Sequence, residues 1–342
     1  PIRLGSGSGA SSTPDQTSSS LPSWQGGTIT TQGLGVFKGV QDPVKVSLYI
    51  NGDSAYNMAN TTGSYNTTVG YQAGVAITGG GGNVIVGRNA GRYINNGANN
   101  VMVGNFAGHA YNSTENVFIG KFSGYANSKS HNVSIGCDTM QQAYPTEYSV
   151  AIGYMAGYGA GGENQIYIGR EAGKSTSAYN NQTGDNNIGI GAYALNKVTS
   201  GAENVAIGSG AGTVLTSGTR NTILGFEAAY KLTSSGSNVI IGARAGYNST
   251  ATDNTFVGTF AGNKNTSGGQ NTSVGKSAGY NLTTGSGNTF MGYQAGYSNT
   301  TGIYNVFIGE SCGYNHTTPS YNTFIGYRVA MNNNSYNGAN VF

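Results

Sequence analysis

Residues 305–313 read Asn-Val-Phe-Ile-Gly-Glu-Ser-Cys-Gly, and the same pattern recurs through most of the chain. The typical copy has Asn, a β-branched residue, a variable residue, an aliphatic residue and Gly; a small residue follows three positions later. Sixteen copies occur, 16 or 17 residues apart except for one interval of 22, and positions are counted here from the central glycine. These central glycines are Gly70, Gly87, Gly104, Gly120, Gly136, Gly153, Gly169, Gly191, Gly208, Gly225, Gly242, Gly258, Gly275, Gly292, Gly309 and Gly326. A short fixed period of this kind is typical of a solenoid.

The three residues before each central glycine predict a short strand. Position −3 is β-branched and position −1 is aliphatic in every copy, as in Val150 and Ile152. Such side chains suit a pleated surface, and residues two apart share one face of a strand, so we expect positions −3 and −1 to form the buried row. The glycine ends the strand because it tolerates a positive φ. The expected fold is all-β: a parallel β-solenoid of about 16 coils with a 16–17-residue period over residues 61–342.

Position −4 is Asn in fourteen of the sixteen copies, with Ser149 and Gln165 as the exceptions. Asn tolerates left-handed backbone and bonds to its own backbone in turns. Stacked coil upon coil, it also forms amide ladders along a fibre. Sugar binding is the alternative use of so many amides, and we favour the ladder.

The prediction about assembly is based on position −2. If the side chains at positions −3 and −1 point into the coil, the side chain at position −2 should point outward. Position −2 is nevertheless apolar in twelve of sixteen copies. Strands that are apolar on both faces are buried on both faces, and an exposed apolar stripe ~75 Å long would aggregate. We therefore expect identical chains to associate as a homotrimer, in a side-by-side or intertwined arrangement. The predicted trimer interface is Ile85, Phe118, Ile240, Phe256, Phe290, Phe307 and Phe324.

The composition indicates an extracellular fibre rather than an enzyme. Charged residues make up 8% of the chain, whereas an ordinary domain has about 25%. The net charge of +3 is dispersed, so no nucleic-acid partner is expected. No apolar stretch is long enough to cross a membrane. We expect no catalytic residues, no cofactor and no metal site, because the three histidines are scattered and no carboxylate pair recurs.

The chain divides into three predicted segments. Residues 1–23 are rich in Ser and Gly and predict a flexible arm or linker. Residues 24–60 contain the single Trp and predict one or two strands that cap the first coil. We expect residues 1–60 to attach the chain to other fibre, baseplate or virion proteins. The shaft, residues 61–342, ends within a repeat.

Two side-chain types remain. Cys137 and Cys312 lie ten coils apart, a separation of ~48 Å, so no disulfide joins them. Tyrosines recur at position +5, directly after the second glycine, and are candidates for contact with a glycan; a stacked ladder, or packing on an adjacent subunit, is the alternative that we favour. They are Tyr125, Tyr158, Tyr247, Tyr280, Tyr297 and Tyr314.

Particular copies resemble known families. Residues 149–153 (Ser-Val-Ala-Ile-Gly) and 204–208 (Asn-Val-Ala-Ile-Gly) resemble the head repeat of trimeric autotransporter adhesins, whose heads are left-handed parallel β-rolls assembled as trimers. Residues 322–330 (Asn-Thr-Phe-Ile-Gly-Tyr-Arg-Val-Ala) are similar to repeats of bacteriophage tail fibres. This chain departs from the adhesin pattern in its longer period and in the bulky residues at position −2.

The resemblance implies a non-enzymatic extracellular fibre. We expect the shaft of a phage tail or virion fibre that serves as a rigid spacer and as a host-surface adhesin for a glycan or protein receptor. A trimeric adhesin of the bacterial cell surface is the alternative, and a polysaccharide-depolymerising tailspike is the third.

Overall fold

The computed structural model describes two N-terminal strands, at 37–39 and 46–50, and most of residues 63–342; the gaps in that range are 110–111, 143–145, 176–182 and 333–337. The described chain is an all-β parallel solenoid with a period of about 17 residues, and no helix occurs in it. The fold class predicted from the repeat is thereby confirmed. The arm predicted at residues 1–23 lies outside the described residues, as does most of 24–60.

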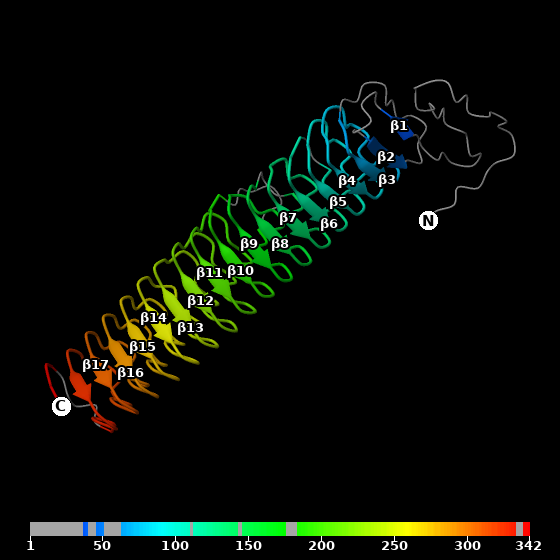
Figure 1. Cartoon of the computed structure of the whole chain (residues 1–342). Coiled ribbons are helices and arrows are strands. Elements are labelled where there is room, and N and C mark those ends of the chain that lie inside the picture. Colours follow the sequence, from blue (N-terminus) through cyan, green and yellow to red (C-terminus); the bar gives the residue numbers. More distant parts are fainter. Residues whose placement is uncertain are drawn as a thin grey trace, which may run out of the picture.

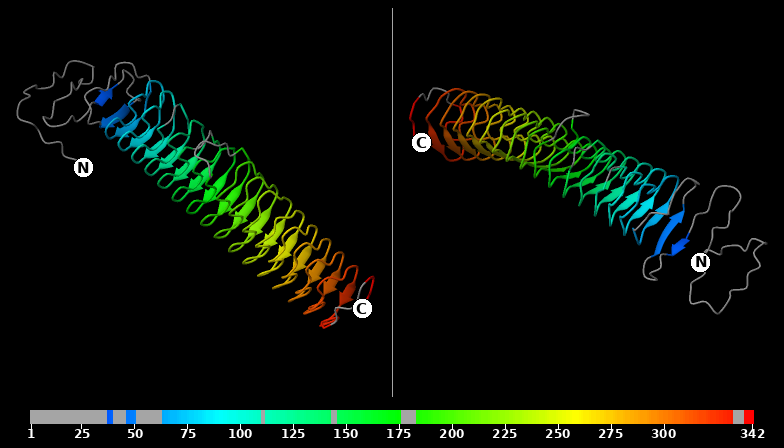
Figure 2. Two further views of the ribbon diagram at one scale, coloured as in Figure 1. Left: turned by 180° about the vertical axis from the view of Figure 1, so that it is seen from behind. Right: turned by 90° about the horizontal axis from the view of Figure 1, so that it is seen from above.

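Seventeen strands, β2 to β18, form one parallel sheet along a single side of the elongated molecule (Figures 1 and 2). Corresponding repeat positions pair from coil to coil, so that Phe290 lies beside Phe307. β1 is antiparallel to β2, which pairs in parallel with β3. The strands are β1 (Phe37–Gly39), β2 (Val46–Ile50), β3 (Thr67–Val69), β4 (Val84–Val86), β5 (Val101–Val103), β6 (Val117–Ile119), β7 (Val133–Ile135), β8 (Val150–Ile152), β9 (Ile166–Ile168), β10 (Ile188–Ile190), β11 (Val205–Ile207), β12 (Thr222–Leu224), β13 (Val239–Ile241), β14 (Thr255–Val257), β15 (Thr272–Val274), β16 (Thr289–Met291), β17 (Val306–Ile308) and β18 (Thr323–Ile325).

The predicted inner and outer faces of the strands are exchanged. In β3 to β18 the middle residue, position −2, is buried within its own coil, and the two flanking residues are half-buried or exposed. The predicted interface residues are therefore core residues with no exposed surface in the single chain: Ile85, Phe118, Ile240, Phe256, Phe290, Phe307 and Phe324. The physical reason is the width of the coil, which admits one side chain from each three-residue strand.

The core of the described coils is built mainly from side chains at positions −2, +3 and +7, and Met140, Leu195 and Ala229 add buried side chains at position +4. Position +3 is usually Ala, and in six coils the sizes at −2 and +7 are complementary, whereas Ile85/Ile94 and Ile223/Leu232 are large at both positions and Ala151/Ala160 is small at both. Small residues at −2 accompany large aliphatic residues at +7 in the pairs Gly189/Val198, Ala206/Leu215 and Ser273/Leu282. Phenylalanine at −2 accompanies a buried asparagine at +7 in the pairs Phe118/Asn127, Phe256/Asn265 and Phe290/Asn299. In these six pairs a larger side chain at one position accompanies a smaller one at the other, which favours close packing.

The asparagines at position −4 form a buried ladder, which confirms the structural use predicted for them. The Oδ1 of Asn271 accepts hydrogen bonds from the backbone N–H of Asn288 at 3.0 Å and from its Nδ2 at 3.1 Å. The Nδ2 of Asn288 also donates to the carbonyl of Gly302 at 2.8 Å. Both exceptions continue the ladder: Ser149 Oγ accepts from the backbone N–H of Gln165 at 3.0 Å. These bonds satisfy backbone N–H groups at strand starts that would otherwise be buried without partners.

The central glycines are required by backbone geometry. Gly258 has a φ of +134°, and a Cβ at this position would lie 2.5 Å from the carbonyl oxygen of Gly275 in the next coil. Left-handed backbone also occurs at positions −5 and +2, which are non-glycine residues except at Gly82, Gly210 and Gly287. Arg220, with a φ of 58°, and Phe260, with a φ of 59°, are examples. Inter-coil hydrogen bonds hold this strained conformation, since Phe260 N–H donates to the Ala243 carbonyl at 3.0 Å.

Candidate functional surfaces

The outer sheet face, formed by positions −3 and −1 of β3 to β18, is a continuous, largely apolar surface along the described chain. Position −1 is Val, Ile or Leu in fifteen of the sixteen strands and Met291 in the other, and position −3 is Val, Ile or Thr. Several of its side chains are exposed to solvent, including Val84 at 41%, Leu224 at 43% and Ile325 at 58%. Both strand faces are therefore apolar, as the sequence indicates. The exposed stripe, however, consists of positions −3 and −1, which the sequence analysis predicted to be buried.

Four of the six tyrosines in the predicted row stack on other tyrosines. All six members are half-buried: Tyr125, Tyr158, Tyr247, Tyr280, Tyr297 and Tyr314. Tyr280, Tyr297 and Tyr314 form a continuous stack with ring centroids 5.2 and 4.9 Å apart and nearly parallel planes. Tyr247 stacks on Tyr230 at 5.1 Å. Partial burial and the neighbouring Tyr314 and Tyr280 raise the pKa of Tyr297. The ring faces within each stack cover one another, so they are not free to stack on sugar rings.

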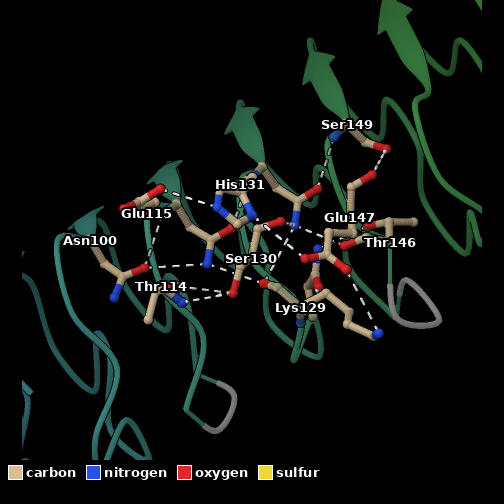
Figure 3. A network of polar contacts seen from close by, with 12 residues as sticks. Asn100, Thr114, Glu115, Lys129, Ser130, His131, Thr146, Glu147 and Ser149 are labelled. Carbon is tan, nitrogen blue, oxygen red and sulfur yellow. Dashed lines mark hydrogen bonds and ion pairs between the residues drawn. The ribbon is translucent and has the colours of Figure 1, made fainter.

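A polar network joins three coils at position −5. Figure 3 shows His131 between two carboxylates: its Nε2 lies 3.1 Å from Glu115 Oε2, and its Nδ1 lies 3.5 Å from Glu147 Oε1. Lys129 approaches Glu147 at 3.8 Å, and the His131 ring stacks on Tyr148. The side chains of His131 and Glu115 are 38% and 55% exposed, so solvent screens the pairs and their contribution to stability is small. The network was not predicted, although the sequence places Glu115 and His131 at the same repeat position.

A second cluster, which we call the aromatic–basic corner, lies just after β4, β5 and β6. Phe106 stacks on Phe122 with centroids 5.2 Å apart, and His109 stacks on Tyr125 at 4.7 Å. The two stacks touch edge to face, with Phe122 and Tyr125 5.4 Å apart. The remaining members are a tyrosine and three cations. The full set is Arg88, Arg92, Tyr93, Phe106, His109, Lys121, Phe122 and Tyr125. Sequence analysis selected only Tyr125 from it, because Arg92 and His109 share its column, +5, without being tyrosines, and the other members lie at positions +1, +2 and +6.

Desolvation by burial, with a contribution from the charge of Arg92, lowers the pKa of His109 below its ordinary value. The imidazole is therefore neutral at pH 7. The positive charge of the aromatic–basic corner at this pH comes from Arg88, Arg92 and Lys121.

Other candidate chemistry is sparse in the part of the chain that the structure describes. Cys137 and Cys312 are both free thiols, as their predicted separation requires. Burial raises the pKa of the Cys312 thiol to about 11, so it is protonated and unreactive at neutral pH. Across residues 63–342, apart from the gaps, no three His, Cys, Asp or Glu side chains are arranged to hold a metal ion.

Comparison with known proteins identifies no relative: no protein-family model matches the chain, and neither a curated protein nor a solved structure matches it significantly. Within the described residues, no helix has the length and hydrophobicity to cross a bilayer.

Proposed function

We propose that this chain is the non-enzymatic shaft of an extracellular fibre, and that it associates as a homotrimer through the outer sheet face. The observation that carries the proposal is the unbroken apolar column at position −1, sixteen strands long, on a regular rod (Figure 1). At one strand every ~4.8 Å, this stripe is ~75 Å long. A contiguous apolar surface of that size marks an interaction site in a soluble protein.

Three further features support a fibre. Every coil contacts only its neighbours, so the length of the rod is set by repeat number and its stiffness by the stacked ladders. The parallel sheet and the asparagine ladder run without interruption from β3 to β18. The exposed surface is charge-poor and rich in hydroxyl and amide groups, which suits a spacer that holds a receptor-binding surface away from its anchor.

We propose that the fibre belongs to a phage tail or virion, since residues 322–330 are similar to tail-fibre repeats. In that setting residues 1–60 attach the shaft to other fibre, baseplate or virion proteins, and the lateral surface contacts a receptor on the host cell. The Ser-Val-Ala-Ile-Gly copy at 149–153 favours a bacterial trimeric adhesin as the second candidate. A self-cleaving chaperone domain downstream in the gene would favour the phage fibre, and a membrane-anchor domain would favour the adhesin.

A charge on the outer sheet face should separate the chains. In a threefold assembly, Leu224→Asp places three carboxylates at one level of an apolar interface, where each buried charge lacks a partner. We expect the mass by light scattering to fall to that of one chain, while the far-ultraviolet circular dichroism spectrum is unchanged.

The matched control is Ser234→Asp, which adds the same charge on an exposed turn outside the sheet. It should leave the mass unaltered. If Leu224→Asp kept the mass and melting temperature of the unmodified protein, the outer sheet face would not be the interface.

A further inference from the structure

The aromatic–basic corner has a geometry that the fibre role alone does not explain. Its two ring stacks run along the rod axis, so each ring covers the face of the next and turns its edge sideways. The edge of an aromatic ring carries the positive part of its quadrupole. Edge-to-face contacts between the stacks, such as that of Phe106 with His109 at 5.2 Å, fix the four rings relative to one another. The rings thus form a rigid, weakly electropositive surface.

Three cations are held on this surface by the rings. The Arg88 guanidinium lies 5.7 Å from the centroid of Phe106, and Lys121 Nζ lies 5.1 Å from that of Phe122. Arg92 lies 5.3 Å from the centroid of Tyr93. Cation–π contacts orient these long side chains without neutralising them.

These three cations form no ion pair with a described residue. By contrast, Lys129, Lys174, Arg220 and Arg244 each lie within 4 Å of a glutamate carboxylate. The coil that follows Lys121 places one acidic residue next to the corner. This residue is Asp138, at position +2, and it accepts a hydrogen bond from the Cys137 thiol. The corner therefore combines three unneutralised positive charges with a single flanking carboxylate.

The spacing of the charges indicates an extended ligand. Arg88 and Lys121 both occupy position +1, two coils apart, which corresponds to ~10 Å along the rod. One carboxylate or phosphate does not span that distance, whereas a chain with anionic groups at intervals does. Charge-assisted hydrogen bonds to guanidinium and ammonium groups are the strong contacts available to such a chain.

We propose that the aromatic–basic corner binds an acidic polysaccharide, whose anionic groups pair with Arg88, Arg92 and Lys121 while its sugar rings lie against the ring edges. The Tyr93 and Tyr125 hydroxyls supply hydrogen bonds to sugar oxygens. A single-stranded nucleic acid is the less suitable polyanion, because its bases need free aromatic faces and these faces cover one another. The choice of a polysaccharide rests on the proposed cell-surface role of the fibre.

The test uses the full chain with oligogalacturonate as the carboxylated probe and its neutral methyl ester as the control. A phosphorylated glucan of equal length distinguishes phosphate from carboxylate recognition. We expect calorimetric binding of at least one acidic oligosaccharide, weakening as salt is raised, and no binding of the methyl ester. Arg88→Gln combined with Arg92→Gln should lower the affinity by about tenfold or more, since each loses a charge-assisted hydrogen bond.

The matched control combines Arg170→Gln with Arg328→Gln. Both arginines lie over tyrosine rings, at 4.6 and 4.9 Å from the centroids, but outside the aromatic–basic corner. We expect this control to change the affinity by less than about twofold, since it leaves the corner intact and removes only distant, screened charges.

Three results would overturn the proposal: no binding of either acidic oligosaccharide, equal losses for the two double variants, or tighter binding of a single-stranded oligonucleotide of equal charge. The light-scattering mass separates these failures from a failure of the fibre proposal. A trimer that binds no acidic sugar refutes only the ligand, and a monomer that binds one refutes only the assembly.

Discussion

Replacement of Phe256 by alanine should destabilise the solenoid by about 3–5 kcal/mol, since it empties a fully buried position of the coil core. Neither neighbouring core side chain is large enough to fill the space of the lost ring, because position −2 of the next coil is Ser273 and position +7 of the same coil is Asn265. Urea unfolding followed by circular dichroism, at one fixed protein concentration, measures the loss.

The complementarity of core sizes predicts a rescue. Adding Asn265→Leu to Phe256→Ala recreates the pairing of Ala206 with Leu215 that the chain itself uses. We expect the double variant to recover at least about half of the lost stability, whereas Asn265→Leu alone should overpack the coil and cost about 1–3 kcal/mol. If the two substitutions were simply additive, positions −2 and +7 would not share one core volume.

Replacement of Gly258 by alanine should also be severely destabilising. The new Cβ would lie 2.5 Å from a backbone oxygen of the next coil, at a φ of +134° that L-residues rarely adopt. Neither atom can move without breaking the stacking of two coils, so we expect a loss of at least about 3 kcal/mol. Thermal melting and limited proteolysis report it.

Gly189→Ala is the matched control, because it makes the same chemical change at a glycine without a left-handed φ. Its new Cβ would meet a side-chain atom of Tyr167 at 3.1 Å, and other coils carry Ala at this position. A loss below about 1 kcal/mol is expected. Equal losses at Gly189 and Gly258 would mean that the central glycines have no special backbone role.

The repeat in the sequence was sufficient to predict the strands, their parallel stacking and the asparagine ladder. Each copy offers β-branched residues before a glycine, and Asn has an evident use when it recurs at one level of every coil. The ladder also survives its exceptions, because Ser149 and Gln165 still supply oxygen acceptors to the next backbone N–H.

The faces of the strands could not be assigned from alternation alone. In Val-Phe-Ile all three residues are apolar, so a period of two does not distinguish the inner face from the outer. The missed signal is the spread in size: position −2 ranges from Gly189 to Tyr167, and in six coils position +7 compensates for it, whereas position −1 is always a medium-sized apolar residue, Val, Ile, Leu or Met. A side chain that must fit a partner of variable size belongs to the core.

The sites at the corners were the least predictable. Phe106 and Phe122 adopt left-handed backbone with φ values of 57° and 55°, which local preference disfavours for aromatic residues. Coil stacking overrides that preference and brings their rings against His109 and Tyr125. Because the cluster combines several repeat columns, a search along the tyrosine column alone does not find it.

The measurement that tests the central claim most directly is the mass of the purified, unmodified chain by static light scattering. The outer sheet face predicts a single species of three times 35.0 kDa that persists on dilution to micromolar concentration. A soluble, monodisperse species of 35.0 kDa would contradict the account, because the outer sheet face would then be stable in water without a partner.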